Sequence, residues 1–483
     1  MIFSHGGSNA LTWIALLGWP FVVFTMFALL GPRRAALWSL VIGSTFLPEG
    51  AFLFAGLPEY TKQSATSVSV LLASILLDAG RPLRVRFRWV DLAIVAWCVG
   101  RFATSLSNGL GAYDGLSQTF IELVRWGIPY WVGRTYFSDD DGLRELARGI
   151  AIGGLLYMPL CLFEVRFSPQ LHTKIYGFLT TPFYMVLRYD GYRPMVFMQT
   201  SLMVAMWMAS ATVLCAWLGY SGAVKKLFGL PTKWFVIPLA ITTMLCKAFG
   251  AITLMLVGIS FYFIARRARS ALPVAAFALL VGSYPMLRYT GVMSQNGILS
   301  AASVAYDAER LDSLGIRLRS EDMFIGHASD RPLLGWGGWG RSNVYVEGVG
   351  RAVPDGLWVI ALASAGWLAL ASLMAMFLTP TVQVLRRFRA ARWARPDTAP
   401  YVAMAVLVLI YWVDCLSNAM VNAVLVAAIA GTNGWFAARQ RKPATTPTLP
   451  DAPSEGTVQS PETTGPPLSL GRALSSRRRG PPA

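Results

Sequence analysis

Thirteen apolar runs, most of them separated by short loops, constrain the fold of this chain more than any other feature. A helix needs about 20 mostly apolar residues to cross a bilayer. The runs are 10–31, 36–57, 64–80, 89–107, 116–135, 147–165, 194–218, 234–247, 250–265, 271–291, 355–379, 400–416 and 419–436. They predict an all-α polytopic membrane protein with about 12–13 transmembrane helices. Composition agrees, because only 14% of the 483 residues are charged and soluble proteins carry about 25%.

Short clusters of Lys and Arg lie between these runs. They are Arg33-Arg34, Arg81 to Arg88, Arg134, Lys225-Lys226, Arg266 to Arg269, Arg386 to Arg395 and Arg439 to Lys442. With one loop skipped between successive clusters, all fall on one side of the membrane, which the positive-inside rule makes cytoplasmic. The N-terminus is then outside, and the first run is expected to be a retained helix, not a signal peptide. Because the basic residues follow helix ends and form no single patch, the net charge of +17 does not indicate a nucleic-acid partner.

The chain divides into a polytopic membrane domain, 1–442, and a segment rich in Pro, Ser, Thr and Gly, 443–483. That composition predicts a disordered cytoplasmic tail. Two of the predicted outer loops are long, 166–193 and 292–354. The second is expected to hold short helices, and it contains six arginines and seven acids. Such a balanced loop is compatible with the outer face.

The 292–354 loop contains the strongest candidates for chemistry. Pro332 precedes a turn with Gly335 and Gly337, and glycines can bring backbone N–H groups close to a ligand. Asp355 opens the next apolar run and has two interpretations. It is either a helix N-cap, the commoner role, or a base whose pKa depends on nearby arginines.

Arg188 and Arg193 lie in the other long outer segment, just before the run at 194–218. Guanidinium groups bind phosphate oxygens in a bidentate manner, so these arginines suit a diphosphate. Anchoring at the membrane surface explains them equally well.

Several charged residues lie inside or near the ends of apolar runs: Arg101, Glu122, Arg125, Lys247 and Asp414. Each costs about 3 kcal/mol at a helix centre, so each should face a partner or a wet cavity. Glu122 and Arg125 are three residues apart and are expected to neutralise each other. Lys247 suits a tight outer turn, and its role and that of Asp414 stay open. Five cysteines in or beside apolar runs and only three histidines indicate neither a disulfide framework nor a metal centre.

Residues 317–370 resemble the signature region of the O-antigen ligase and polymerase superfamily of bacterial envelope glycosyltransferases. The positions that match its pattern in order and spacing are Arg317, Pro332, Gly335, Gly337, Asp355 and Gly366. The segment from Arg188 to Pro194 is similar to the family's other outer arginine segment, and the layout matches over about residues 180–436. Two positions depart, because Asp355 and Arg331 stand where the ligases often have His. These departures favour a polysaccharide polymerase, or a related glycan transferase, over a lipopolysaccharide ligase.

The resemblance implies a multi-pass, GT-C-like glycosyltransferase of the bacterial inner membrane that needs no metal or other cofactor. Its donor would be a glycan linked to a polyprenyl diphosphate, and its acceptor a glycan or a lipid. By this carry-over Arg188, Arg193 and Arg317 bind the donor diphosphate, and Asp355 with Arg317 forms the catalytic pair. The aromatic side chains expected to contact sugars are Trp336, Trp339 and Tyr345. Other polysaccharide export components are expected partners.

Two alternatives accompany this hypothesis. The base could instead be one of four other residues, namely Glu164, Glu321, His327 or Asp330. The protein could also be a flippase of the same pathway, although transporters typically show internal repeats and polar residues at the bilayer midplane. No repeat is evident, and the polar residues concentrate in the outer loops.

Overall fold

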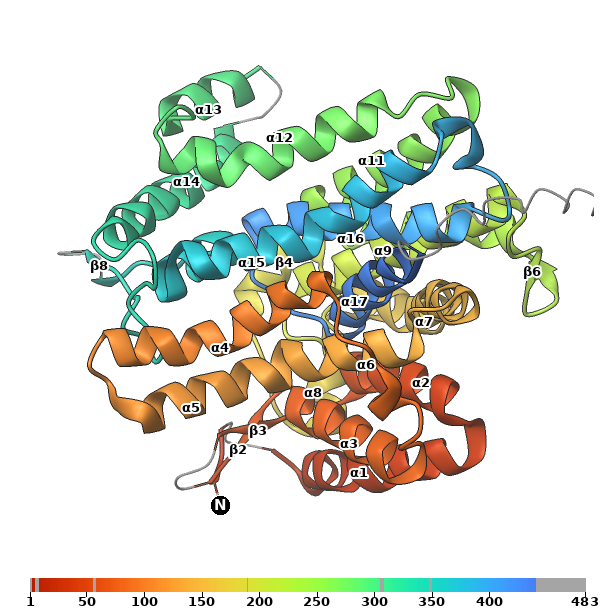
Figure 1. Ribbon diagram of the computed structural model, residues 1–483, viewed down its shortest axis with the longest axis horizontal. Coiled ribbons are helices and arrows are strands. Elements are labelled where there is room, and N and C mark those ends of the chain that lie inside the picture. The colour runs from red at the N-terminus through yellow and green to blue at the C-terminus, as the bar shows by residue number, and fades with distance from the viewer. Residues whose placement is uncertain are drawn as a thin grey trace, which may run out of the picture. The chain divides into compact units, whose positions relative to one another are not determined.

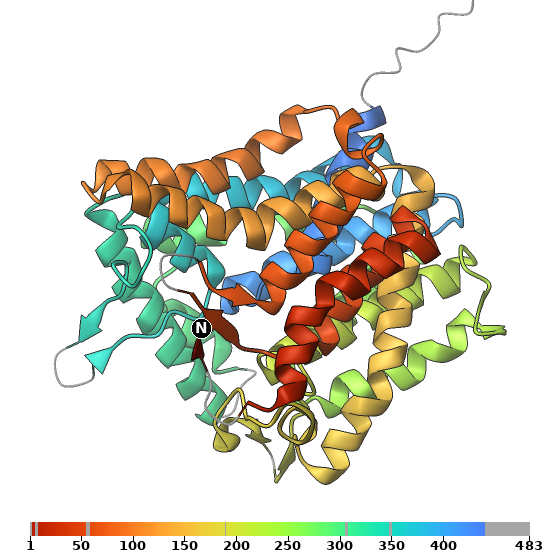
Figure 2. The same ribbon diagram turned by 90° about the horizontal axis from the view of Figure 1, so that it is seen from below.

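The computed structural model describes residues 2–4, 8–54, 58–188, 190–304, 308–346 and 350–439 (Figures 1 and 2). The segment 443–483, predicted to be a disordered tail, lies outside the described residues. The helices are α1 (Ala10–Leu30), α2 (Pro32–Phe46), α3 (Lys62–Leu77), α4 (Leu92–Ser107), α5 (Gly111–Glu122), α6 (Ile128–Tyr136), α7 (Asp140–Phe167), α8 (Leu171–Tyr176), α9 (Ser201–Ser221), α10 (Val236–Leu245), α11 (Phe249–Arg267), α12 (Leu272–Tyr289), α13 (Gln295–Ala302), α14 (Ala308–Ser329), α15 (Leu357–Arg387), α16 (Ala399–Ser417) and α17 (Ala423–Ala438). The short helical turns are η1 (Pro82–Arg84), η2 (Trp89–Asp91), η3 (Leu123–Gly127), η4 (Phe183–Val186), η5 (Thr232–Phe235) and η6 (Ala390–Arg392).

Strands are few and short. They are β1 (Ile2–Phe3), β2 (Ala51–Leu53), β3 (Tyr60–Thr61), β4 (Leu187–Arg188), β5 (Gly191–Tyr192), β6 (Lys226–Leu227), β7 (Leu230–Pro231), β8 (Tyr345–Val346) and β9 (Gly350–Arg351). All pair antiparallel: β1, β2 and β3 form one small sheet, and the others form hairpins. In Figure 2 the small sheet, in dark red, lies beside the end of the red helix α1.

The helices confirm a multi-pass membrane protein. Among the described residues, eight helical segments are long and apolar enough to span a membrane: α1, η2 with α4, α7, α9, α11, α12, α15 and α16. Three shorter apolar helices are α3, η5 with α10, and α17. Each of the thirteen predicted runs overlaps a helix, so hydropathy located these apolar helices while overestimating how many are long enough to cross alone. The loop 292–354, expected to hold short helices, contains the short α13 but also α14, which is 22 residues long.

One predicted span is wrong in its extent. The run 36–57 does not continue as a helix, because α2 ends at Phe46 and β2 follows at Ala51. Pro48 explains the end, since the residue before a proline is driven out of the helical region, and Leu47 has extended backbone angles. The run 250–265 is slightly longer in the structure, where it forms the helix α11 of 19 residues, long enough to span a membrane.

Burial separates the centre of the bundle from its rim. The most apolar windows of α9 and α16 are 89% and 94% buried, whereas those of α1 and α12 are only 22% buried. The exposed side chains of α1 include Ile14, Phe21 and Leu29. Large apolar groups are left uncovered in this way when their solvent is lipid, so α1 and α12 suit the lipid boundary.

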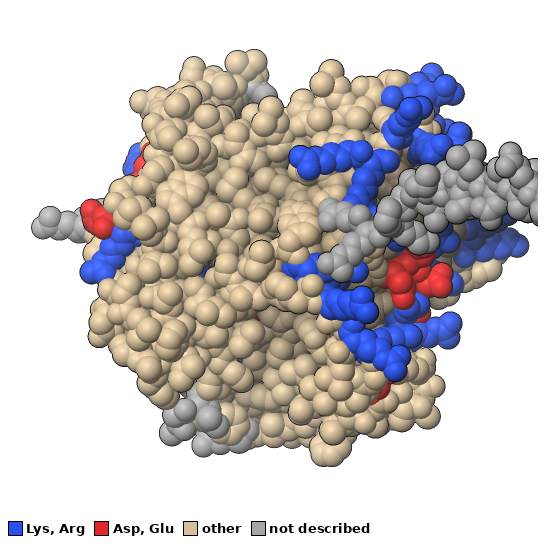
Figure 3. Space-filling model, viewed as in Figure 1, with Lys and Arg blue, Asp and Glu red and all other residues tan. Residues whose placement is uncertain are grey.

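The predicted cytoplasmic clusters gather at one end of the helices. Figure 3 shows most of the Lys and Arg on the visible face at the end where Figure 1 places β6 and the turn between α11 and α12. Arg88 and Arg387 both donate to carbonyls at the end of α17, those of Ala437 and Phe436, and Arg439 pairs with the first turn of α7. This end is called the basic end below. Its assignment to the cytoplasm stays a prediction of the positive-inside rule.

Candidate functional site

The three arginines predicted to bind a diphosphate line one cavity. Arg188 ends β4, Arg193 follows β5, and Arg317 lies on α14, more than 120 residues further along the chain. All three border a cavity of about 210 Å³, here called the arginine cavity, which α16 closes on another side. These three arginines were predicted as a group from the family resemblance, and the fold places them around one cavity.

Two further charged residues line the arginine cavity. Lys247 lies between α10 and α11 with a positive φ of 52°, and its Nζ donates to the carbonyl of Arg188 at 2.9 Å. The expected tight turn is therefore confirmed. Asp414, near the end of α16, is buried and accepts a hydrogen bond of 2.7 Å from the amide of Asn418. Four cationic side chains and one carboxylate thus border the cavity, a surplus that favours an anion.

Asp355 forms an ion pair with Arg317, with 3.4 Å between Oδ2 and Nε. The helix-cap interpretation is wrong, because the N-cap of α15 is Gly356 and no side chain caps it. Both partners are partly exposed, 37% for the Arg317 side chain and 45% for that of Asp355. An exposed pair of this kind adds little stability. The ion pair matters for position instead, because the Arg317 guanidinium both borders the arginine cavity and contacts the Asp355 carboxylate.

Glu164 holds the segment that carries Arg188 and Arg193. This carboxylate, on α7, is 1% exposed and accepts hydrogen bonds from the backbone N–H groups of Leu171, Met195 and Val196, at 2.9, 2.8 and 2.7 Å. Two of the three donors directly follow Arg193-Pro194. Glu164 is therefore occupied as an acceptor for backbone groups, which disfavours it as the base.

Arg288 fastens α14, the helix that carries Arg317, to the membrane bundle. Its side chain on α12 is 1% exposed and makes four interactions with residues between 293 and 322. They are Nε to Glu321 Oε2 (3.2 Å), Nη2 to Asp322 Oδ1 (2.8 Å), Nη2 to the carbonyl of Leu318 (3.2 Å) and Nη1 to the carbonyl of Met293 (2.7 Å). One guanidinium thereby orients the turn of α14 next to Arg317.

Glu321 is a member of this clamp and is disfavoured as the base. It also accepts hydrogen bonds from the Tyr284 hydroxyl at 2.7 Å and the Trp358 indole at 3.4 Å. Burial raises the pKa of Glu321, and the bonds from Tyr284 and Arg288 oppose that rise. Of the remaining alternatives, Asp330 is exposed at the end of α14.

The glycine-rich segment after α14 docks into a break in α15. At Ala365 and Gly366 the helix leaves helical geometry, with φ and ψ of 67° and −164° at Gly366. Four backbone hydrogen bonds replace those that the break removes: Trp336 N–H to Ala363 O (2.9 Å), Gly337 N–H to Ser364 O (2.9 Å), Trp367 N–H to Pro332 O (2.7 Å) and Leu368 N–H to Leu333 O (3.3 Å). The segment thus satisfies backbone groups that a broken helix leaves unpaired.

Close approach explains two of the glycines. A Cβ on Gly335 would lie 2.5 Å from the backbone nitrogen of Ala365, and one on Gly366 would lie 2.3 Å from the carbonyl oxygen of Leu333. The expectation that the turn offers free N–H groups to a ligand is wrong. The N–H of Gly335 donates to Arg331 O and that of Gly337 to Ser364 O. The motif spacing therefore serves the contact between loop and helix.

The three aromatics expected to contact sugars lie in different surroundings. Trp336 stacks on His327, with ring centroids 4.5 Å apart and an interplanar angle of 6°, and its indole donates to the carbonyl of His327 at 2.7 Å. The Arg331 guanidinium lies 4.5 Å from the same ring. Trp336 is therefore engaged within its own loop. Trp339 is 57% exposed and lines a second cavity, while Tyr345, in β8, is 72% exposed.

Glu122 and Arg125 do not act as the expected pair. Glu122 lies 3.6 Å from Arg101 and accepts a 2.8 Å hydrogen bond from Trp97, while Arg125 lines the second cavity. The fold joins α4 to the end of α5, and this helix contact decides which cation meets the acid.

Comparison with known proteins identifies no family. The chain matches no protein-family model and shows no significant match to a curated protein. Within the described ranges, no group of three or more His, Cys, Asp or Glu side chains could hold a metal ion.

Proposed function

We propose that this protein is a membrane glycosyltransferase that takes a glycan from a polyprenyl diphosphate and transfers it to a hydroxyl group of a glycan or lipid acceptor. The setting would be the outer face of the bacterial inner membrane during exopolysaccharide or O-antigen synthesis. One observation carries the proposal: Arg188, Arg193, Lys247 and Arg317, from three separate parts of the chain, border one cavity. A diphosphate is the ligand that such a group of cations suits best.

The proposed step is a single displacement. Asp355 takes the proton of the acceptor hydroxyl, and the oxygen attacks the anomeric carbon of the donor sugar. The bond from that carbon to the phosphate oxygen breaks, and polyprenyl diphosphate leaves with the electron pair. The cations of the arginine cavity stabilise the charge on this leaving group. The anomeric configuration inverts.

Arg317 is the residue on which this mechanism most depends. It borders the cavity and contacts Asp355 at 3.4 Å, so the leaving-group site and the base adjoin one guanidinium. Asp355 stands where the ligases often have His, and this difference favours polymerisation as the reaction.

The test is gel analysis of surface glycan from a deletion strain carrying variants of this chain. Arg317→Ala and Asp355→Ala are each expected to lower polymer formation about 100-fold or more. Losses of this size are usual when a group that stabilises developing charge is removed, as in Arg317→Ala, or when a general base is removed, as in Asp355→Ala. Lipid-linked single repeats should accumulate. Arg319→Ala is the matched control, because Arg319 is exposed on the same helix and does not line the cavity. Immunoblots of membranes establish equal insertion.

Other outcomes separate the rival functions. Normal chain length from both variants contradicts the mechanism. Long polymer retained on the lipid carrier in the deletion strain indicates a ligase, and single repeats trapped on the cytoplasmic face indicate a flippase.

A further inference from the structure

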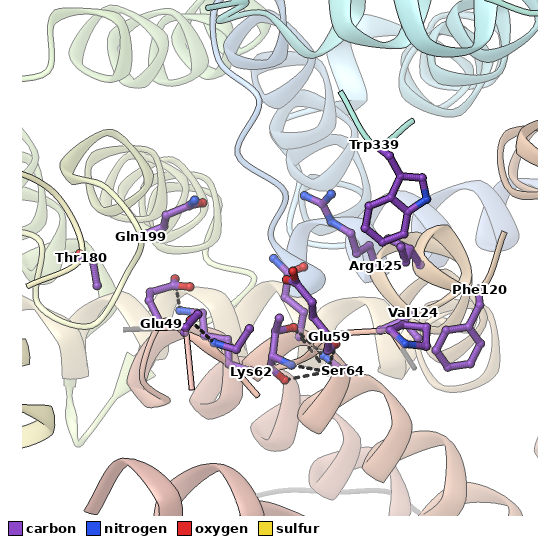
Figure 4. Close-up of a pocket in the computed structure, with 17 residues that line it drawn as sticks. Glu49, Glu59, Lys62, Ser64, Phe120, Val124, Arg125, Thr180, Gln199 and Trp339 are labelled. Atoms are coloured by element: carbon purple, nitrogen blue, oxygen red, sulfur yellow. Dashed lines mark hydrogen bonds and ion pairs between the residues drawn. The ribbon is translucent and has the colours of Figure 1, made fainter. Parts of the chain in front are cut away.

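A second cavity, of about 560 Å³, lies between the N-terminal sheet and the middle of the α5–η3–α6 helix. It is called the N-terminal cavity below. Figure 4 shows Glu49 and Lys62 on one side, Trp339 and Arg125 on another, and Thr180 and Gln199 on a separate segment. The walls thus come from four parts of the chain that are distant in sequence.

Buried polar contacts form the floor of this cavity. Lys62 begins α3, is only 4% exposed, pairs with Glu49, and donates to the carbonyls of Ser44 and Phe197 at 3.2 and 3.1 Å. The backbone N–H of Glu49 in turn donates to His172 Nε2 at 3.2 Å. A buried lysine and its carboxylate partner are therefore held at fixed positions before any ligand arrives.

The charges of the N-terminal cavity balance. Glu49 and Glu59 face Lys62 and Arg125, whereas the arginine cavity has four cations and one acid. Balanced charge, with amide and hydroxyl groups between, disfavours a phosphate and suits an uncharged ligand with many hydroxyls.

Two aromatic rings add a surface on which a sugar ring can pack. Phe120 on α5 is 47% exposed, and Trp339 is 57% exposed. The loop that carries Trp339 is anchored on both sides, by the contact with the broken helix α15 and by the 2.9 Å ion pair between Arg341 and Asp114. Rigid aromatics with a few placed polar groups are the usual lining of a small-molecule site.

We infer that the N-terminal cavity binds an uncharged saccharide of the acceptor chain, separately from the cavity that holds the donor diphosphate. The inference rests on the proposed function. The donor's reacting sugar is bonded to its diphosphate and must stay beside the arginines, so a cavity with no lining residue in common with theirs suits the other substrate. Both cavities are lined by the segment between α8 and α9, with Thr180 and Gln199 at one and Arg188 and Arg193 at the other.

The test is a binding experiment that requires no turnover. Purified full-length protein in nanodiscs is titrated with two probes. One is a lipid-free oligosaccharide released by mild acid from the host's own surface polysaccharide, observed by saturation-transfer NMR. The other is farnesyl diphosphate. Trp339→Ala and Phe120→Ala remove aromatic surface from two separate elements, and both side chains are exposed enough for the variants to fold. Trp234→Ala is the matched control, because Trp234 is 60% exposed in η5 and does not line either cavity.

The expected result is a double separation. Trp339→Ala and Phe120→Ala each weaken oligosaccharide binding tenfold or more and leave farnesyl diphosphate binding unchanged. Arg317→Ala weakens farnesyl diphosphate binding tenfold or more and leaves oligosaccharide binding unchanged. Trp234→Ala changes the binding of neither probe. Oligosaccharide binding that is absent, insensitive to both aromatic variants, or lost with Arg317→Ala overturns this inference. Farnesyl diphosphate binding that does not depend on Arg317 overturns the proposed function instead, so the two failures are distinguishable.

Discussion

Replacing Gly335 by alanine should undock the segment 332–337 from the break in α15. The added Cβ would lie 2.5 Å from the backbone nitrogen of Ala365 and 2.6 Å from the carbonyl carbon of Ser364. Backbone atoms cannot rotate away, so the loop must move. That movement breaks the two hydrogen bonds donated by Trp336 and Gly337.

The magnitude follows from two contributions. Gly335 has a φ of 64°, and a left-handed conformation costs a non-glycine residue about 1 kcal/mol. Each lost backbone hydrogen bond adds about 1 kcal/mol, so the total is about 3 kcal/mol. Gly340→Ala is the control that isolates the clash. Its φ is 80°, but its added Cβ would meet only the end of the flexible Asn343 side chain. This variant should cost about 1 kcal/mol.

Hydrogen exchange measures the difference directly. A gap of about 2 kcal/mol corresponds to about a 30-fold change in an equilibrium constant. The amides of Trp336 and Gly337 should therefore lose protection about 30-fold more in Gly335→Ala than in Gly340→Ala, in protein held in nanodiscs. Equal protection in the two variants would refute the docking of this segment against α15.

Two further predictions concern α14 and the membrane orientation. Arg288→Met should destabilise the packing of α14 by about 3–5 kcal/mol, because it leaves the buried Glu321 without its cation. Limited proteolysis should then cut α14 in the variant. Unchanged resistance to the protease would show that Arg288 does not hold α14 in place. Ile316→Cys, 62% exposed beside Arg317, should react with an impermeant maleimide added outside intact cells, whereas Phe228→Cys, 63% exposed at the basic end, should react only after permeabilisation. The native cysteines are all buried, so background labelling is low, and the opposite pattern would place Arg317 in the cytoplasm and end the proposed function.

The sequence predicted best the features that depend on local composition, namely the apolar helices and the basic clusters at their ends. Each of the thirteen apolar runs overlaps a helix, and most of the basic residues on the face shown in Figure 3 lie at one end of the helices. Helix bounds were less predictable, as the early end of α2 before Pro48 shows. The convergence of Arg188, Arg193 and Arg317 was accessible only through a family resemblance, since nothing in their local sequence links them.

The partners of the polar groups were decided by tertiary structure. Asp355 pairs with Arg317 and caps no helix, and Glu122 meets Arg101 and not Arg125. Gly335 and Gly366 allow the loop and the broken helix α15 to approach closely. The physical reason is the range of the forces involved. The free energy of transferring a segment into a bilayer depends on the residues of that segment alone. It can therefore be judged from the local sequence. Hydrogen bonds and ion pairs act over a few ångströms, so their partners depend on which helices pack side by side, and only the folded chain determines that.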